Sequence, residues 1–188
     1  RNATVTTIAP TGSISIIAGC SSGIEPLFAI SFIRNVLGGT RLFEINPLFE
    51  TTVKERSLYS AKLLEEIART GSVQNIGGVP EDVKRIFVTA LDIQPEWHVR
   101  MQAAFQKCTD NAVSKTVNLP FEASVEEVRK VFELAWEIRC KGITVFRYGS
   151  KPEQVLYTGE IKTEKRKFIA AESEYAGGCP TKTCPFPN

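Results

Sequence analysis

Cys179 and Cys184 are the residues of this 188-residue sequence whose type and spacing most directly suggest chemistry. Four residues separate the two thiols, so a flexible segment can close them into a small disulfide ring. Lys182 lies between them, and a nearby cation favours the thiolate, which is the form that attacks a disulfide. The other interpretation is half of a zinc site, but zinc takes four ligands, and this segment has neither a histidine nor a third cysteine. We therefore predict a redox pair and no metal.

The second candidate site is the turn at residues 10–15, which is rich in small and hydroxyl-bearing side chains. Residues 3–8 before it alternate and are β-branched, which predicts a strand, and residues 14–18 after it predict the start of a helix. Free backbone N–H groups at a helix start suit a phosphate, and Gly12 lets the backbone approach closely. The Gly-Lys pair of a P-loop is missing. The residues alone equally allow a capping turn with no ligand.

The remaining cysteines and the single histidine predict no catalytic pair. Cys20 lies in a Gly/Ser turn, but His98 is distant in sequence and falls within a predicted helix. We expect Cys20, Cys108 and Cys140 to be buried structural thiols. His98 is expected to pack or to hydrogen-bond, and Glu25 is expected to hold the adjacent turn in place.

Composition is that of an ordinary globular protein, with 43% hydrophobic and 23% charged residues. A net charge of +2 argues against nucleic-acid binding by phosphate neutralisation. No apolar run approaches the ~20 residues that span a bilayer, so no membrane partner is expected. Five irregularly spaced cysteines do not form a secreted disulfide framework, which favours a cytoplasmic protein with reduced thiols. The start at Arg1 without a secretory pattern suggests a piece of a longer chain.

The elements that must position these residues follow from periodicity and turn residues. Two β-rich segments, 27–37 and 40–45, flank Gly38-Gly39 and predict a hairpin. Helical spacing predicts one run from residue 46 to Gly71, and further helices that begin at Pro80 and Pro95. The buried face of the helix after Pro95 is predicted to consist of Val99, Met101, Ala103 and Phe105, with Cys108 as a further candidate.

The segment from residue 115 to residue 146 predicts a parallel βαβ unit. Residues 115–119 and 142–146 are strand-like, and Ser124 with Glu127 forms a capping box that starts the helix between them. The fold class is therefore α/β with a hairpin insertion. Residues 1–149 are predicted to be one domain and residues 150–188 a flexible tail, because that composition cannot bury enough surface to fold.

Three segments resemble class II ribonucleotide reductases, whose catalytic subunits use adenosylcobalamin. They are residues 6–26 (TTIAPTGSISIIAGCSSGIEP), residues 98–120 (HVRMQAAFQ, then DNAVSKTVNLP) and residues 135–147 (AWE, then CKGITVFR). The resemblance implies that the chain is the C-terminal portion of the family's ten-stranded α/β barrel. It also implies that the radical-bearing cysteine and the pair that reduces the substrate lie upstream, so the chain would be inactive alone.

The resemblance also implies roles for the two candidate sites. The turn would bind the phosphates of a ribonucleotide substrate, largely through main-chain amides. Its residues are Thr11, Gly12, Ser13, Ile14 and Ser15. Cys179 and Cys184 would re-reduce the disulfide of the active site, taking electrons from a thioredoxin- or glutaredoxin-type reductant, with Gly177-Gly178 as the hinge.

Phe146 and Arg147 bear on the class of reductase. Reductases fed by a separate radical-generating subunit have two adjacent tyrosines here, and neither Phe146 nor Arg147 can relay a radical. This difference favours a vitamin B12-dependent ribonucleoside-diphosphate reductase with adenosylcobalamin as cofactor, completed by the rest of the barrel. The alternative is a non-catalytic assembly or regulatory module that descends from the same barrel.

Overall fold

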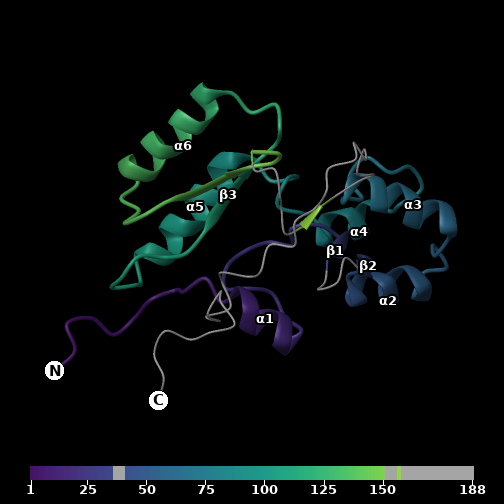
Figure 1. Ribbon diagram of the computed structural model, residues 1–188, viewed down its shortest axis with the longest axis horizontal. Coiled ribbons are helices and arrows are strands. Elements are labelled where there is room, and N and C mark those ends of the chain that lie inside the picture. The colour runs from purple at the N-terminus through teal and green to yellow at the C-terminus, as the bar shows by residue number, and fades with distance from the viewer. Residues whose placement is uncertain (36–40, 151–155, 158–188) are drawn as a thin grey trace, which may run out of the picture.

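The computed structural model describes residues 1–35, 41–150 and 156–157 (Figure 1). The helices and strands occur in the following order: α1 (Gly12–Ala18), β1 (Ser31–Asn35), β2 (Arg41–Ile45), α2 (Pro47–Glu55), α3 (Ala61–Thr70), α4 (Glu81–Ile86), α5 (Pro95–Gln106), β3 (Thr116–Leu119), α6 (Val125–Glu137), β4 (Thr144–Arg147) and β5 (Leu156–Tyr157). This mixture confirms the predicted α/β class. None of the helices in the described ranges has the length and hydropathy of a membrane span.

The predicted βαβ unit is confirmed. β3 and β4 pair in parallel, with Val117 opposite Val145, and α6 connects them. Ser124 and Glu127 form both hydrogen bonds of the capping box that starts α6. Buried Val117 and Leu119 from β3 pack in one cluster with Val99 of α5 and with apolar residues of α6. In Figure 1, β3, α5 and α6 accordingly lie together as one group.

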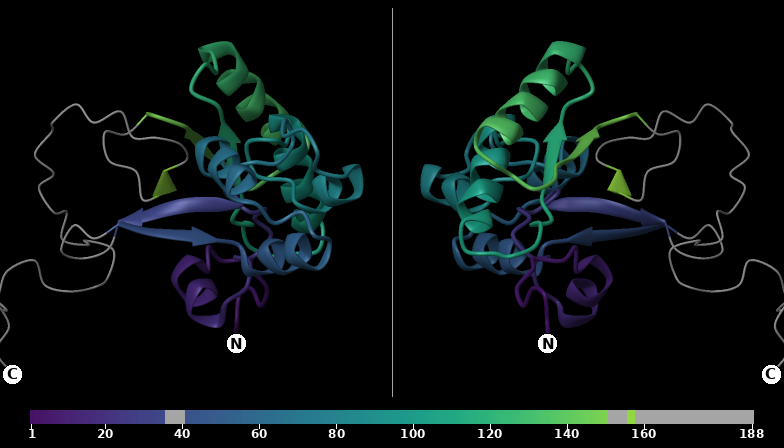
Figure 2. Two further views of the ribbon diagram at one scale, coloured as in Figure 1. Left: turned by 90° about the vertical axis from the view of Figure 1, so that its right-hand side faces the viewer. Right: turned by 90° about the vertical axis from the view of Figure 1, so that its left-hand side faces the viewer.

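The hairpin prediction is also confirmed, although its turn at residues 36–40 lies outside the described residues. β1 and β2 pair antiparallel, with Ile33 opposite Phe43, and extend to one side of the helices (Figure 2). Unexpectedly, β5 pairs with the other edge of β1, where Tyr157 lies opposite Ile33. A strand therefore occurs inside segment 150–188, for which the sequence predicted only a tail. Cys179, Cys184 and the remainder of that segment lie outside the described residues.

The single helical run predicted from residue 46 to Gly71 is wrong. It is two helices, α2 and α3, because Ser57 adopts a left-handed backbone with φ of 56°. The side chain of Ser60 then caps a new helix by accepting from Leu63 N. Both helices contribute to a core with α4, in which Phe49 and Phe87 meet edge to face at 5.0 Å.

The predicted buried face of α5 is half wrong. Val99 and Ala103 are buried, but Met101 and Phe105 are 49% and 42% exposed. Polar residues at helical spacing replace them in the interior, and these are His98, Gln102 and Gln106. Their role is to satisfy backbone carbonyls of irregular segments: the amide of Gln102, for example, donates to Val113 O at 3.0 Å and to Gly142 O at 2.6 Å.

Candidate functional site

The predicted phosphate turn begins α1, whose first residue is Gly12. The chain before the turn runs beside residues 111–114 and forms one parallel bridge, Ile8 to Val113. Ser114 N donates to Ile8 O at 2.8 Å, which fixes the point where the chain enters the turn. The turn is therefore held by the segment that leads directly into β3.

The strand predicted at residues 3–8 is reduced to this one bridge. The amides of Val5 and Thr6 donate to the carboxylate of Asp110 at 3.0 and 3.2 Å instead of to a neighbouring strand. These bonds, with the Thr6 hydroxyl, hold the pKa of Asp110 below its usual range. The extended backbone was therefore predicted correctly, but its main partner is a side chain.

Hydrogen bonds divide the residues of the turn into two kinds. Ser15 is buried, its N donates to Thr11 O at 3.0 Å, and its hydroxyl donates to Gly12 O at 2.7 Å. The Thr11 hydroxyl lies 3.2 Å from the hydroxyl of Ser22. Ser13 is exposed, and its side chain makes no hydrogen bond to the residues that the structure describes, while Ile14 is 63% exposed. Thr11 and Ser15 therefore shape the turn, and Ser13 is the hydroxyl that it presents to solvent.

The backbone amides of residues 12–14 precede the first helical hydrogen bond, which Ser15 N donates to Thr11 O. They are therefore the amides that a helix start leaves without a helical acceptor. Apart from its chain neighbours, no described residue lies close to Gly12, since a Cβ added there would meet no heavy atom within 4 Å. The positive end of the helix dipole adds to the attraction for an anion. Amides in this arrangement are available to donate to a small anionic group.

Two of the three predicted buried thiols are exposed. Cys20 follows the left-handed Gly19 at the end of α1, and Cys108 lies just past the end of α5. Both positions lie just after the ends of helices, where the side chains face outward. Cys140 is partly buried, and burial raises the pKa of its thiol. None of the three has the histidine neighbour of a nucleophilic pair, since His98 bonds elsewhere.

A buried charged cluster, which sequence reasoning missed, lies beside the turn. Lys115 is 2% exposed, and its ammonium donates to Glu25 Oε2 at 2.6 Å, to Thr116 O at 2.5 Å and to His98 Nδ1 at 2.9 Å. Glu25 Oε1 accepts from Thr116 N at 2.5 Å. Glu25 was expected to hold the adjacent turn, but its carboxylate binds Lys115 and Thr116, which are about 90 positions away in the sequence. The only sequence signal was a lysine at the start of the predicted strand that contains Val117 and Leu119.

The tautomer of His98 follows from its two partners. Nδ1 faces an ammonium, so it accepts, and Nε2 therefore carries the proton and donates to Ala90 O at 3.0 Å. Burial, and then the charge of Lys115, lowers the pKa of His98, so the ring is neutral. Burial also lowers the pKa of Lys115, an effect that the bond and charge of Glu25 oppose.

The described residues do not fit a cobalamin or a resident metal. His98 is the only histidine, it is fully buried, and both of its ring nitrogens have partners. Within the described ranges no three histidine, cysteine or acidic side chains gather as metal ligands do. His98 therefore offers no ring nitrogen to a cobalt ion.

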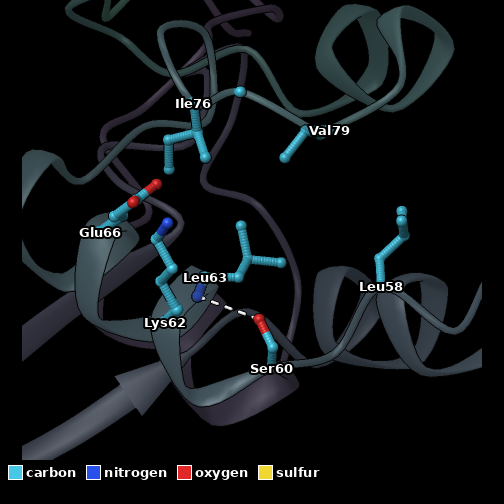
Figure 3. Close-up of a pocket in the computed structure, with 9 residues that line it drawn as sticks. Leu58, Ser60, Lys62, Leu63, Glu66, Ile76 and Val79 are labelled. Carbon is cyan, nitrogen blue, oxygen red and sulfur yellow. Dashed lines mark hydrogen bonds between the residues drawn. The ribbon is translucent and has the colours of Figure 1, made fainter.

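A separate hollow of about 410 Å³ lies between α3 and residues 76–79 (Figure 3). Its lining includes Leu63, Ile76 and Val79, with Lys62 and Glu66 from α3. The one hydroxyl in the lining, that of Ser60, caps α3. No predicted site residue lies in this hollow, and it offers a phosphate only the single cation of Lys62.

The sequences and structures of known proteins that match this chain include those of ribonucleotide reductases, which is consistent with the α/β fold. The family model described as "Ribonucleotide reductase, barrel domain" matches residues 1–146. The chain is 46% identical, over 98% of its length, to the vitamin B12-dependent ribonucleoside-diphosphate reductase of Thermoplasma acidophilum, and covers 26% of that protein. It is 47% identical to the protein of the same name from Mycobacterium tuberculosis, with 99% of this chain and 26% of that protein covered.

A solved structure shows the same fold at lower identity. The alpha subunit of the class Id ribonucleotide reductase of Actinobacillus ureae superposes with a TM-score of 0.60 at 21% identity, covering 74% of this chain and 25% of that one. The chain thus has the fold of part of a reductase barrel, and it belongs to the ribonucleotide reductase barrel-domain family. It spans about a quarter of the length of the curated relatives that it matches.

Proposed function

We propose that this chain is the C-terminal part of a vitamin B12-dependent ribonucleoside-diphosphate reductase, and that its turn at residues 11–15 binds the phosphates of the substrate. The parent enzyme would convert ribonucleotides to deoxyribonucleotides by thiyl radical chemistry. Two observations support the reaction class: membership of the barrel family and the names of relatives at 46–47% identity. The observation that carries the phosphate assignment is the row of uncovered amides at the start of α1.

In this proposal the parts of the turn have separate tasks. The amides of Gly12, Ser13 and Ile14 donate to phosphate oxygens, and the exposed hydroxyl of Ser13 adds one more donor. Thr11 and Ser15 hold the turn in shape through the bonds described above. The exposed Ile14 side chain supplies only its amide.

We also propose that Cys179 and Cys184 form the redox shuttle of the parent enzyme. In thiol–disulfide exchange the tail dithiol would reduce the disulfide left in the barrel after turnover and would itself become a disulfide. A thioredoxin- or glutaredoxin-type protein would then return the tail to the dithiol by the same exchange. The lysine between the two thiols supports this role, because it favours the attacking thiolate.

Adenosylcobalamin would supply the radical in the parent enzyme. The names of the relatives support this cofactor, and so does the pair Phe146-Arg147, which has no phenol for a radical relay. Because both ring nitrogens of His98 already have partners, we assign no cobalt ligand to the described residues. The protein would act in the cytoplasm, where its thiols stay reduced.

Two variants of Gly12 in the full-length reductase test the phosphate assignment. Gly12→Pro deletes one amide donor, yet proline suits the first position of a helix, so α1 should persist. Gly12→Ala is the matched control, since it keeps the amide and its Cβ meets nothing within 4 Å. A hydrogen bond to a charged group contributes about 1.5–3 kcal/mol, so Gly12→Pro should raise KM for the ribonucleotide by about 10- to 150-fold.

The alanine control should leave KM near the wild-type value. Ser13→Ala, which removes one neutral donor, should have a smaller effect than Gly12→Pro, and Thr11→Ala should act only by loosening the turn. Equal KM values for Gly12→Pro and Gly12→Ala would refute the assignment.

A further inference from the structure

The phosphate turn belongs to a longer excursion of the chain, residues 9–24, whose two ends are fixed on one short stretch. At the entry, Ile8 O accepts from Ser114 N at 2.8 Å. At the exit, the carboxylate of Glu25 accepts from Lys115 Nζ and from Thr116 N, at 2.6 and 2.5 Å. Both attachments therefore lie within residues 114–116, at the start of β3.

Inside the excursion, the exit side supports the turn directly. The hydroxyl of Ser22 lies 3.2 Å from that of Thr11. Gly23, with φ of 52°, brings the returning chain so close that an added Cβ would lie 3.6 Å from Ala9 O and 3.9 Å from Thr11 Oγ1. Glu25 N donates to Ser22 O at 2.9 Å, so the residue that anchors the exit also orders the turn that touches Thr11.

The anchor at the exit is the ion pair between Glu25 and Lys115, and each proton of the Lys115 ammonium has an acceptor. The ammonium of Lys115 has three protons and three acceptors: the Glu25 carboxylate, Thr116 O and His98 Nδ1. His98 is itself fixed by its bond to Ala90 O, while Ala90 N donates to Leu27 O at 2.7 Å. The hydrogen-bond network therefore also reaches Leu27, two residues after Glu25. Loss of the carboxylate would leave a buried ammonium without its counter-charge, which is strongly unfavourable.

We propose that the Glu25–Lys115 ion pair is a clasp that closes the 9–24 excursion, so that Glu25 and Lys115 are positioning residues for the phosphate turn; this role rests on the function proposed above. Neither side chain touches the substrate. They act by holding the amides of residues 12–14 in place before the phosphate binds. Binding then loses less conformational entropy, because the turn is already ordered.

The test is Glu25→Gln in the full-length reductase, compared with Glu133→Gln. The first variant keeps the shape of the side chain and removes the charge. The control removes the charge of an exposed ion pair, Glu133 with Arg129 at 3.2 Å, which contributes little. In Glu25→Gln the amides of residues 9–24 should exchange hydrogen about tenfold faster, with no such change elsewhere in the barrel. KM for a ribonucleoside diphosphate should rise about tenfold at unchanged kcat per folded enzyme.

A role limited to stability predicts the opposite pattern, in which the amount of folded enzyme falls while KM stays constant. If Glu25→Gln does not fold, Glu25→Gln/Lys115→Met carries the same test, because it leaves no unpaired charge in the interior. Unchanged exchange in residues 9–24 would overturn the clasp. Faster exchange with unchanged KM would overturn the positioning role.

The Gly12→Pro variant separates this inference from the function on which it rests. If Gly12→Pro raises KM and Glu25→Gln changes neither KM nor exchange, the phosphate turn stands and the clasp is wrong. If Gly12→Pro leaves KM unchanged, the phosphate assignment is wrong, and with it the positioning role.

Discussion

Acidification should destabilise this protein through one residue, His98. Its ring is buried and neutral, Nδ1 faces the ammonium of Lys115, and Nε2 donates to Ala90 O. Because the pKa of His98 is lowered in the folded state, the unfolded chain takes up a proton at a higher pH than the folded chain does. The contribution to stability is therefore complete above the unfolded pKa of about 6.5 and is lost as the pH falls toward the folded pKa.

The magnitude follows from linkage. If His98 stays neutral in the folded protein down to pH 5.5, lowering the pH from 7.5 to 5.5 reduces the free energy of unfolding by up to about 1.4 kcal/mol. The range from pH 7.5 to pH 5.5 suits this measurement, because His98 is the one histidine in the sequence. The carboxyl groups with lowered pKa, those of Asp82, Asp110 and Glu127, titrate below this range.

The assay is urea unfolding of the chain at low protein concentration, followed by circular dichroism at pH 7.5 and pH 5.5 and constant ionic strength. The matched variant is His98→Gln, whose amide can both accept and donate but does not titrate. We expect the pH-dependent loss in the wild type and none in the variant. Greater wild-type stability at pH 5.5 would refute the assigned tautomer, since it would mean an imidazolium stabilised by Glu25. An equal loss in His98→Gln would place the titrating group elsewhere.

Two other predictions concern the tail and the chain alone. Replacing Cys179 or Cys184 with Ser in the full-length enzyme should abolish thioredoxin-driven turnover and leave dithiothreitol-driven turnover largely intact, because only a small dithiol can reach a buried disulfide. A zinc role predicts released metal and no difference between reductants, and full thioredoxin-driven turnover would contradict the shuttle. The 188-residue chain alone should show no reductase activity with adenosylcobalamin, nucleotide and dithiol. It should self-associate in light scattering, because Trp97 and Trp136 are 58% and 81% exposed. Turnover by the chain would contradict the first expectation, and a stable monomer would contradict the second.

Elements with local signals could be predicted from the sequence. The capping box of Ser124 and Glu127 and the Gly38-Gly39 pair between two β-rich segments each depend on residues close in the chain. The βαβ unit followed from short links, which leave parallel pairing as the available arrangement. The break between α2 and α3 was missed because Val53, Leu58 and Ala61 keep a roughly helical spacing across the non-helical residues 56–60.

Features that depend on distant partners could not be predicted. Lys115 and Glu25 are 90 positions apart, so nothing in either local sequence indicates the ion pair. Gln102 is polar and would be expected at the surface, and only the structure shows that its amide donates to Val113 O and Gly142 O in the interior. The phosphate turn lies between these cases: its residue types were visible, but which hydroxyl shapes the turn and which faces solvent required the structure.

The most direct test of the account is a crystal structure of the full-length reductase with a ribonucleoside diphosphate bound. We expect phosphate oxygens at about 3 Å from the amide nitrogens of Gly12, Ser13 and Ile14, with the Ser13 hydroxyl as a further donor. A phosphate bound elsewhere, for example beside Lys62 in the hollow of Figure 3, with residues 11–15 facing only solvent, would contradict the central claim.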